Sequence, residues 1–234
     1  MPRIPVLLYH RITSGQGSSM NTPPDVFAAQ LQHLKRAGWR SATMTDLMHG
    51  RNLGRRRFVV SFDDGYQDFA DTAWPLLKTY GYTAINFVVP TCVGGEDTWD
   101  GGGTPLMSVD TLKQLATEGL EIGLHGWAHE DWDAMPEDTM RTLLAQGLTW
   151  FQDSGLPLTP AFAYPGGKFP RRASDRSTLA HVFEASPLQM AFRIGSSLAQ
   201  VPSKRPWAMC RVPMEGTDGH WKLRVKLRFG RTRF

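Results

Sequence analysis

Short apolar runs alternate with amphipathic stretches along most of this chain. The apolar runs have the length of buried strands and lie at residues 4–9, 58–62, 84–89, 120–124, 161–164 and, more weakly, 189–194. The stretches between them have the periodicity of helices and lie at residues 24–37, 68–80, 108–118, 136–152 and 174–184. Strict alternation of strands and helices predicts a parallel sheet, either open or closed into a barrel.

Proline and glycine mark the ends of the predicted helices. Pro24 and Pro136 lie where a first helical turn tolerates proline. A glycine follows four of the helices, as a left-handed C-terminal cap requires; these are Gly38, Gly81, Gly119 and Gly155. With 234 residues, the chain has the length of one well-buried domain, so we expect residues 1–234 to form a single domain.

Residues capable of chemistry gather at the ends of the predicted strands. Parallel α/β folds bind their ligands at the carboxyl ends of the strands. The positions at or just past these ends are His10, Asp63, Asp64, His125 and the segment Tyr164-Pro165-Gly166. We therefore expect these residues to meet in one site.

Two adjacent carboxylates, Asp63 and Asp64, directly follow the apolar run at 58–62. This arrangement is costly unless a cation or a proton separates the charges. His125 and His129 lie four residues apart at the end of another run, so they can converge on one metal ion. With Asp64 they would supply the three protein ligands of a hydrolytic zinc site. Taken alone, the Asp-Asp-Gly segment is explained equally well by a turn.

The general base has to be found outside the histidine pair. Zinc proteases with the same histidine spacing carry a Glu directly after the first His, and here Gly126 occupies that position. Asp63 is the natural base, because it neighbours a ligand in the sequence. A metal lowers the pKa of its bound water, and a nearby carboxylate can then accept the proton.

These segments together resemble the polysaccharide deacetylases, the NodB-homology group or carbohydrate esterase family 4. The resemblance covers the chain from Val6 to Pro213 and rests on Ser61-Phe62-Asp63-Asp64-Gly65, on His125-x-x-x-His129 and on the segments at 106–108, 121–125 and 162–167. It implies a distorted (β/α) barrel of seven or eight strands. It also implies metal-dependent hydrolysis of N-acetyl groups on amino sugars.

The resemblance further implies the role of each residue. Asp63 would be the base, and Asp64, His125 and His129 would bind the metal ion, most simply Zn²⁺, with Co²⁺ or Ni²⁺ as alternatives. The late strand in which the family carries its acid His is missing here. Instead His10 ends the first apolar run, as in the permuted subgroup that includes poly-N-acetylglucosamine deacetylases. The first strand can neighbour the last in a closed barrel, so His10 would protonate the leaving amine; a buried structural histidine is the alternative.

The third motif departs from the family pattern, which has an Arg before its Pro. Here the segment reads Tyr164-Pro165-Gly166. This segment would contact the substrate, and the N–H of Gly166 would stabilise the oxyanion. Arg211 would supply the missing positive charge beside Asp63, although a structural salt bridge accounts for it equally well.

Eight Trp residues are many for a chain of this length. Trp127 and Trp132, like Trp99, would suit a platform for a sugar ring, with core packing as the equal alternative. The two cysteines, Cys92 and Cys210, lack CxxC spacing and are expected to be free thiols.

The net charge of +4 is concentrated in a basic tail that begins near residue 220. Apolar residues alternate with basic ones at 222–229, which favours a strand. The tail fits a solvated edge, or a surface attracted to anionic lipid or to a phosphate-bearing substrate. Nucleic acid is not an expected partner, because no known binding motif accompanies the charge.

The sequence shows neither an apolar run long enough to span a bilayer nor a signal peptide at its N-terminus. It therefore predicts a cytoplasmic protein, peripheral to the inner membrane if the tail binds lipid. Oligomeric state is not predicted.

The predicted activity is removal of N-acetyl groups from an amino-sugar-containing polysaccharide, oligosaccharide or lipid-linked glycan precursor. Two alternatives stay open. One is a family member that has lost catalysis and only binds carbohydrate. The other is an iron oxygenase, which also uses two His and a carboxylate, although such sites usually lie in β-sandwiches.

Overall fold

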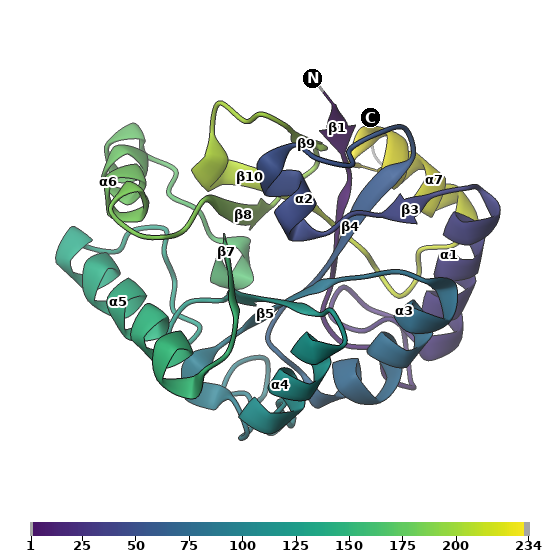
Figure 1. Ribbon diagram of the computed structural model, residues 1–234, viewed down its shortest axis with the longest axis horizontal. Helices are drawn as coiled ribbons and strands as arrows, with labels where there is room; N and C mark the ends of the chain where they lie inside the picture. The colour runs from purple at the N-terminus through teal and green to yellow at the C-terminus, as the bar shows by residue number, and fades with distance from the viewer. Residues whose placement is uncertain (1, 232–234) are drawn as a thin grey trace.

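Seven parallel strands close into a barrel in the computed structural model, which describes residues 2–231 (Figure 1). Around the barrel the neighbours follow the order β2, β10, β8, β7, β6, β5 and β4, and pairing of β2 with β4 completes the circle. The strands are β2 (Val6–Tyr9), β4 (Arg57–Phe62), β5 (Ile85–Val88), β6 (Glu121–Leu124), β7 (Leu158–Ala163), β8 (Met190–Ile194) and β10 (Met209–Pro213). The predicted distorted (β/α) barrel is confirmed.

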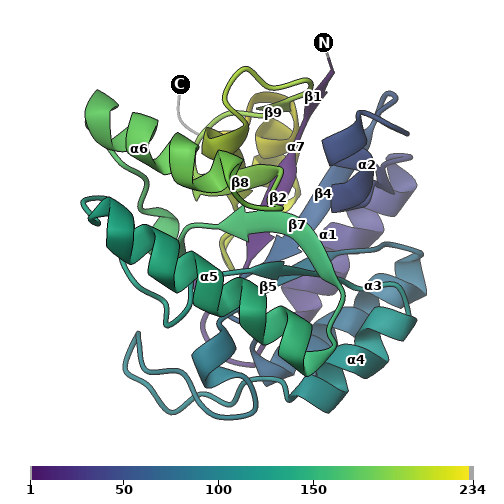
Figure 2. The same cartoon turned by 60° about the vertical axis from the view of Figure 1, so that its left-hand side comes forward.

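Helices surround the barrel, as two views of the ribbon show (Figures 1 and 2). They are α1 (Pro24–Arg36), α3 (Trp74–Tyr80), α4 (Val109–Thr117), α5 (Glu137–Ser154), α6 (Ala173–Glu184) and α7 (His220–Phe229), while the short α2 (Met44–His49) packs against the interior of the barrel. A π-helical turn, η1 (Phe69–Ala73), leads into α3, and short 3₁₀ turns lie at η2 (Pro90–Cys92), η3 (Pro165–Gly167) and η4 (Pro206–Ala208). All five predicted helices are present.

Three short strands lie outside the barrel. β3 (Arg40–Ser41) pairs with the start of β4. β1 (Arg3–Ile4) and β9 (Ala199–Gln200) form an antiparallel pair of their own. The predicted first strand is thus divided at Pro5, which has no N–H to donate to a ladder.

Alternation along the strands creates two apolar layers. Side chains such as Val59, Ile85, Phe87 and Phe192 meet one another inside the barrel, where α2 also packs. The neighbouring positions face outward and pack against the surrounding helices. The carboxylate of Glu121, at the start of β6, accepts hydrogen bonds from the first two N–H groups of α2 (2.5 and 2.8 Å) and so holds that helix against the barrel.

The strand predicted in the basic tail is wrong, because this segment forms α7. Leu223, Lys226 and Leu227 are buried on it, a spacing of three and four residues that places them on one helical face. Gly230, with φ of +76°, ends the helix. β10 and α2 were not predicted at all. Within residues 2–231 no helix combines the length and apolar character that a membrane span requires.

Candidate metal centre and active site

The loops that follow β4 and β6 bring three potential metal ligands together. Asp64, His125 and His129 each offer one ligand atom, and these atoms lie within 4.8 Å of one another. Oδ1 of Asp64 is 3.3 Å from Nε2 of His125 and 3.4 Å from Nε2 of His129. The histidine pair therefore converges from a strand end and a loop, not from a helix.

The backbone bends sharply at both ligand loops. Asp64 has φ of +75° and His129 has φ of +61°, a region in which residues other than glycine are uncommon. Such conformations persist where the surrounding structure holds them, often at functional sites. The ligand positions are therefore fixed by the fold and not by local preference.

His125 is oriented by the neighbouring strand. Its Nδ1 lies 2.8 Å from the carbonyl oxygen of Ala163 at the end of β7. This bond assigns the proton to Nδ1 and leaves Nε2 as the free ligand atom toward Asp64. The orientation matches that of most metal-binding histidines.

Glu130 holds the loop that carries the histidines. Its carboxylate accepts hydrogen bonds from the N–H groups of Trp127 (2.9 Å) and Ala128 (2.6 Å) and from Nε1 of Trp132 (3.2 Å). A Cβ on Gly126 would lie only 2.9 Å from this carboxylate, so the loop needs glycine after His125.

An aromatic stack positions His129. The ring of Trp99 lies 4.1 Å from the imidazole at an angle of 12°. Nε1 of Trp99 donates to the hydroxyl of Tyr66 (3.1 Å), which in turn donates to Asp97 (3.0 Å). Sequence reasoning missed the roles of Tyr66, Asp97 and Glu130; only the closeness of Tyr66 and Glu130 to the two motifs could have indicated them.

The residues present fit a divalent metal ion. Oδ1 of Asp64 is buried and makes no hydrogen bond among residues 2–231, although the two imidazoles face it. Burial alone would raise the pKa of Asp64, but the two histidines hold this pKa far below its usual value. A carboxylate that stays ionised between two imidazole nitrogens is a typical zinc donor set.

Asp63 has a different partner from its neighbour Asp64. Arg211 on β10 grips it with both Nη atoms, Nη1 to Oδ1 and Nη2 to Oδ2 at 2.6 Å. Burial would raise the pKa of Asp63, but the guanidinium of Arg211 outweighs it and lowers this pKa. Arg211 is itself buried and lies over the ring of Phe87 (5.2 Å). The structure thus places Arg211 beside Asp63, as the sequence predicted.

His10 follows β2, which lies between β10 and β4 in the barrel. The expectation that the first strand neighbours the last is confirmed. Burial lowers the pKa of His10, and the charges of Asp63 and Asp64 oppose this effect. Its Nδ1 is buried and has no hydrogen-bond partner in the described part of the chain. His10 therefore lies close enough to both acids for their charges to affect its pKa.

The residues of the predicted segment Tyr164-Pro165-Gly166 lie in different environments. The hydroxyl of Tyr164 donates to the carbonyl of Trp207 (2.7 Å), and its N–H donates to the carbonyl of Phe192 (2.9 Å). Because both donors bond internally, Tyr164 belongs to the packing of the barrel, which corrects its expected contact with substrate. Gly166 is exposed at φ of +59°, and Pro165 lies 3.1 Å from the Cβ position of Gly126.

The two tryptophans expected as sugar platforms lie in different surroundings. Trp132 is fully buried and packs against Phe162 and Phe183, which corrects its expected role as a platform in favour of the core-packing alternative. Trp127 lies with Trp150 and other α5 residues around a shallow cavity of about 550 Å³. Trp99, stacked on His129, is the tryptophan in contact with the candidate metal ligands. Cys92 and Cys210 are free thiols, as expected.

Comparison with known proteins identifies relatives of this chain. The family model described as polysaccharide deacetylase matches residues 50–182. A Bacillus subtilis (strain 168) protein, YxkH, whose name refers it to the polysaccharide deacetylases, is 25% identical over 171 residues, and the match covers 71% of this chain and 58% of YxkH. The chain thus spans little more than half the length of that curated relative.

Solved structures show the same fold over almost the whole chain. The Streptococcus pyogenes deacetylase PplD in complex with acetate has a TM-score of 0.81 at 19% identity, covering 97% of this chain and 99% of PplD. IcaB from Ammonifex degensii has a TM-score of 0.79 at 23% identity, covering 99% of this chain and 98% of IcaB. A de-N-acetylase from Aggregatibacter actinomycetemcomitans has a TM-score of 0.79 at 17% identity, covering 95% of this chain and 98% of that enzyme.

Proposed function

Because this chain belongs to the polysaccharide deacetylase family, we propose that it is a metal-dependent hydrolase that removes N-acetyl groups from an amino-sugar-containing carbohydrate. One observation carries the proposal. Two adjacent acids are divided between two environments, Asp63 on Arg211 and Asp64 between His125 and His129. This division separates a proton acceptor from a metal ligand.

We propose that Asp64, His125 and His129 hold one divalent ion, with Zn²⁺ as the first choice and Co²⁺ or Ni²⁺ as alternatives. Two imidazoles and one carboxylate form the usual three-ligand set of catalytic zinc sites. When bound, such an ion lowers the pKa of a water and polarises a carbonyl oxygen.

In the proposed mechanism the protein residues move the protons. Asp63, kept ionised and oriented by Arg211, accepts a proton from the attacking water. The backbone N–H of Gly166 donates to the developing oxyanion. His10 donates a proton to the departing amine nitrogen, and burial makes its protonated form a stronger acid. The products are acetate and a free amino sugar.

The structure bears on one of the two alternatives considered for this chain. The oxygenase alternative expects a β-sandwich, whereas this chain forms a closed (β/α) barrel, which supports hydrolysis. A family member that only binds carbohydrate is distinguished by the assay of acetate release.

Release of acetate from N-acetylglucosamine oligomers tests the proposal. We expect release by the metal-loaded protein, its loss with a chelator, and its return when Zn²⁺ is added. Asp63→Asn should lower kcat by about 10²–10⁴-fold, the usual contribution of a general base, while Zn²⁺ still binds. Undiminished turnover in Asp63→Asn would falsify the assigned base.

A further inference from the structure

A large cavity of the described chain lies beside the candidate metal centre. It has a volume of about 1340 Å³ and runs between α6 and the connection from β8 to β10. Its lining includes Gly166, just past the carboxyl end of β7, and Ala199 and Gln200 of β9. We call this cavity the basic groove.

The basic groove begins at the segment that supports the histidine loop. Gly166 follows Pro165, whose ring lies 3.1 Å from the Cβ position of Gly126. Two residues earlier, the carbonyl of Ala163 is 2.8 Å from Nδ1 of His125. A ligand lying along the groove would therefore reach the edge of the candidate active site.

Positive charge dominates the lining of the groove. Asp131 pairs with Lys168 (2.6 Å), and Asp133 pairs with Arg171 (3.6 Å). Four further cations line the groove and form no ion pair among residues 2–231. They are Arg176, Arg193, Lys204 and Arg205, and Glu184 is the one other acid of the lining. The groove thus has an excess of unpaired cations.

The bonds that these cations make are to neutral groups. Nη1 of Arg176 donates to the carbonyl of Arg171 (2.7 Å), and Nη1 of Arg193 lies 3.4 Å from the carbonyl of Ile194. Their remaining N–H groups stay available to an anion, and Ser177, Ser197 and Ser203 add hydroxyl donors to the same lining. Guanidinium and hydroxyl groups together are typical of phosphate recognition.

The number of unpaired cations in the basic groove favours a ligand with more than one negative charge. One carboxylate carries a single charge and would leave most of this positive excess unmatched. A diphosphate carries two or more charges and many acceptor oxygens, which suits several separate donors. The volume also exceeds what a single carboxylate fills.

We propose that the basic groove binds the diphosphate of a phosphorylated amino-sugar substrate, an inference that rests on the proposed deacetylase function. Nucleotide-linked and lipid-linked sugars share this chemistry. The groove would hold the diphosphate while the N-acetyl group lies toward Asp63 and the histidines.

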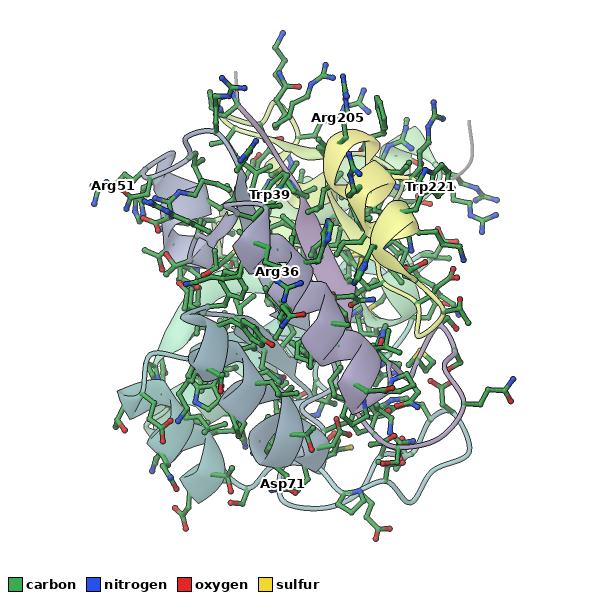
Figure 3. The ribbon with its side chains drawn as sticks, turned by 90° about the vertical axis from the view of Figure 1, so that its right-hand side faces the viewer. Arg36, Trp39, Arg51, Asp71, Arg205 and Trp221 are labelled. Carbon is green, nitrogen blue, oxygen red and sulfur yellow. The ribbon has the colours of Figure 1, made fainter. Side chains whose placement is uncertain are left out.

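Binding of inorganic pyrophosphate, followed by calorimetry at low salt, tests the groove directly. Lys204 and Arg205 are both exposed, so Lys204→Gln/Arg205→Gln should fold normally and bind pyrophosphate at least about tenfold more weakly, because charged hydrogen bonds are lost. Arg193→Gln should weaken binding similarly. Arg36→Gln/Arg51→Gln removes the same charge from α1 and from the segment after α2, away from Arg205 (Figure 3), and should leave binding unchanged.

Kinetics then relate the groove to the substrate. We compare kcat/KM for N-acetylglucosamine diphosphate carrying either a nucleoside or a short prenyl chain with that for neutral N-acetylglucosamine oligomers. The Lys204→Gln/Arg205→Gln variant should lower the ratio of phosphorylated to neutral kcat/KM about tenfold, and the Arg36→Gln/Arg51→Gln variant should not. The substrate, nucleoside-linked or prenyl-linked, whose kcat/KM falls more in the Lys204→Gln/Arg205→Gln variant identifies the source of the diphosphate.

The two proposals fail in different ways. Normal acetate release from neutral oligomers without any pyrophosphate binding overturns the groove and leaves the deacetylase intact. Pyrophosphate binding that depends on the groove cations, without acetate release from any substrate, overturns the deacetylase and keeps an anion site. The groove proposal is also overturned if the Arg36→Gln/Arg51→Gln control weakens pyrophosphate binding as much as the groove variant does. It is likewise overturned if acetate competes with pyrophosphate for binding as well as pyrophosphate itself does.

Discussion

At the scale of single residues, the adjacent acids Asp63 and Asp64 have different partners. Asp63 meets a guanidinium from β10, while Asp64 meets two imidazoles from the loop after β6. Both acids are buried, so each depends on its partner to stay ionised. His129 differs from His125 because an aromatic ring positions it, through the chain from Trp99 to Tyr66 and Asp97.

Replacement of Trp99 by Ala should weaken zinc binding while the barrel stays folded. Without the stack, His129 gains freedom, and outer groups of this kind typically change metal affinity about 10–100-fold. Competition with a chromophoric chelator measures the affinity. Trp99→Phe should restore much of it, and Trp150→Ala, on the α5 side, serves as the control. Unchanged affinity in Trp99→Ala would show that the stack is incidental.

At the scale of elements, α7 shows how burial overrides a local pattern. Its buried face carries Leu223 and Leu227, while Trp221 is 67% exposed and Phe229 is 45% exposed. Arg224 and Arg228 are exposed on the same helix. Trp221 stands beside the helix in the side view of the molecule (Figure 3). Aromatic rings with cations between them suit the surface of an anionic bilayer.

We propose that α7 attaches the protein to anionic membranes. Each cation near such a surface contributes about 1 kcal/mol, so Arg224→Gln/Arg228→Gln should reduce binding to phosphatidylserine vesicles about 30-fold in a sedimentation assay. Trp221→Ser should weaken it further, and Arg36→Gln/Arg51→Gln should have little effect. If the unmodified protein stays in the supernatant at low salt, the attachment is refuted.

At the scale of the whole molecule, a buried polar network joins the last helix to the closing strand of the barrel. Nζ of Lys226 bonds to Oδ2 of Asp218 and to the carbonyl of Pro213 (2.7 Å). Gln30 of α1 donates to the carbonyl of Asp218 (2.9 Å) and accepts from the hydroxyl of Tyr9 on β2 (2.8 Å). The network therefore connects α1, β2, the end of β10 and α7.

Replacement of Lys226 by Met should lower the free energy of unfolding by about 3–5 kcal/mol, because it leaves the buried carboxylate of Asp218 without its main partner. Denaturant unfolding followed by circular dichroism measures the change. Lys222 also approaches Asp218 (3.7 Å), but its side chain is 42% exposed, so Lys222→Met should cost less than about 1 kcal/mol. Similar losses in both variants would contradict the assigned network.

The sequence by itself determined the alternation of strands and helices, and it predicted the three potential metal ligands that the structure brings together. These features are encoded locally, in the periodicity of apolar residues and in acids and histidines placed directly at strand ends. The same reasoning placed His10 beside the acids, because the order of strands in a closed barrel brings the first strand next to the last.

Only the tertiary structure decided which distant side chains meet. Trp99 stacks on His129, Tyr66 joins Trp99 to Asp97, and Trp132 is buried in the core. The tail became a helix because one face of it could be buried against the barrel and its neighbours. The physical reason is common to these cases: burial and contact between distant segments depend on how the barrel closes, and no local pattern of residues contains that information.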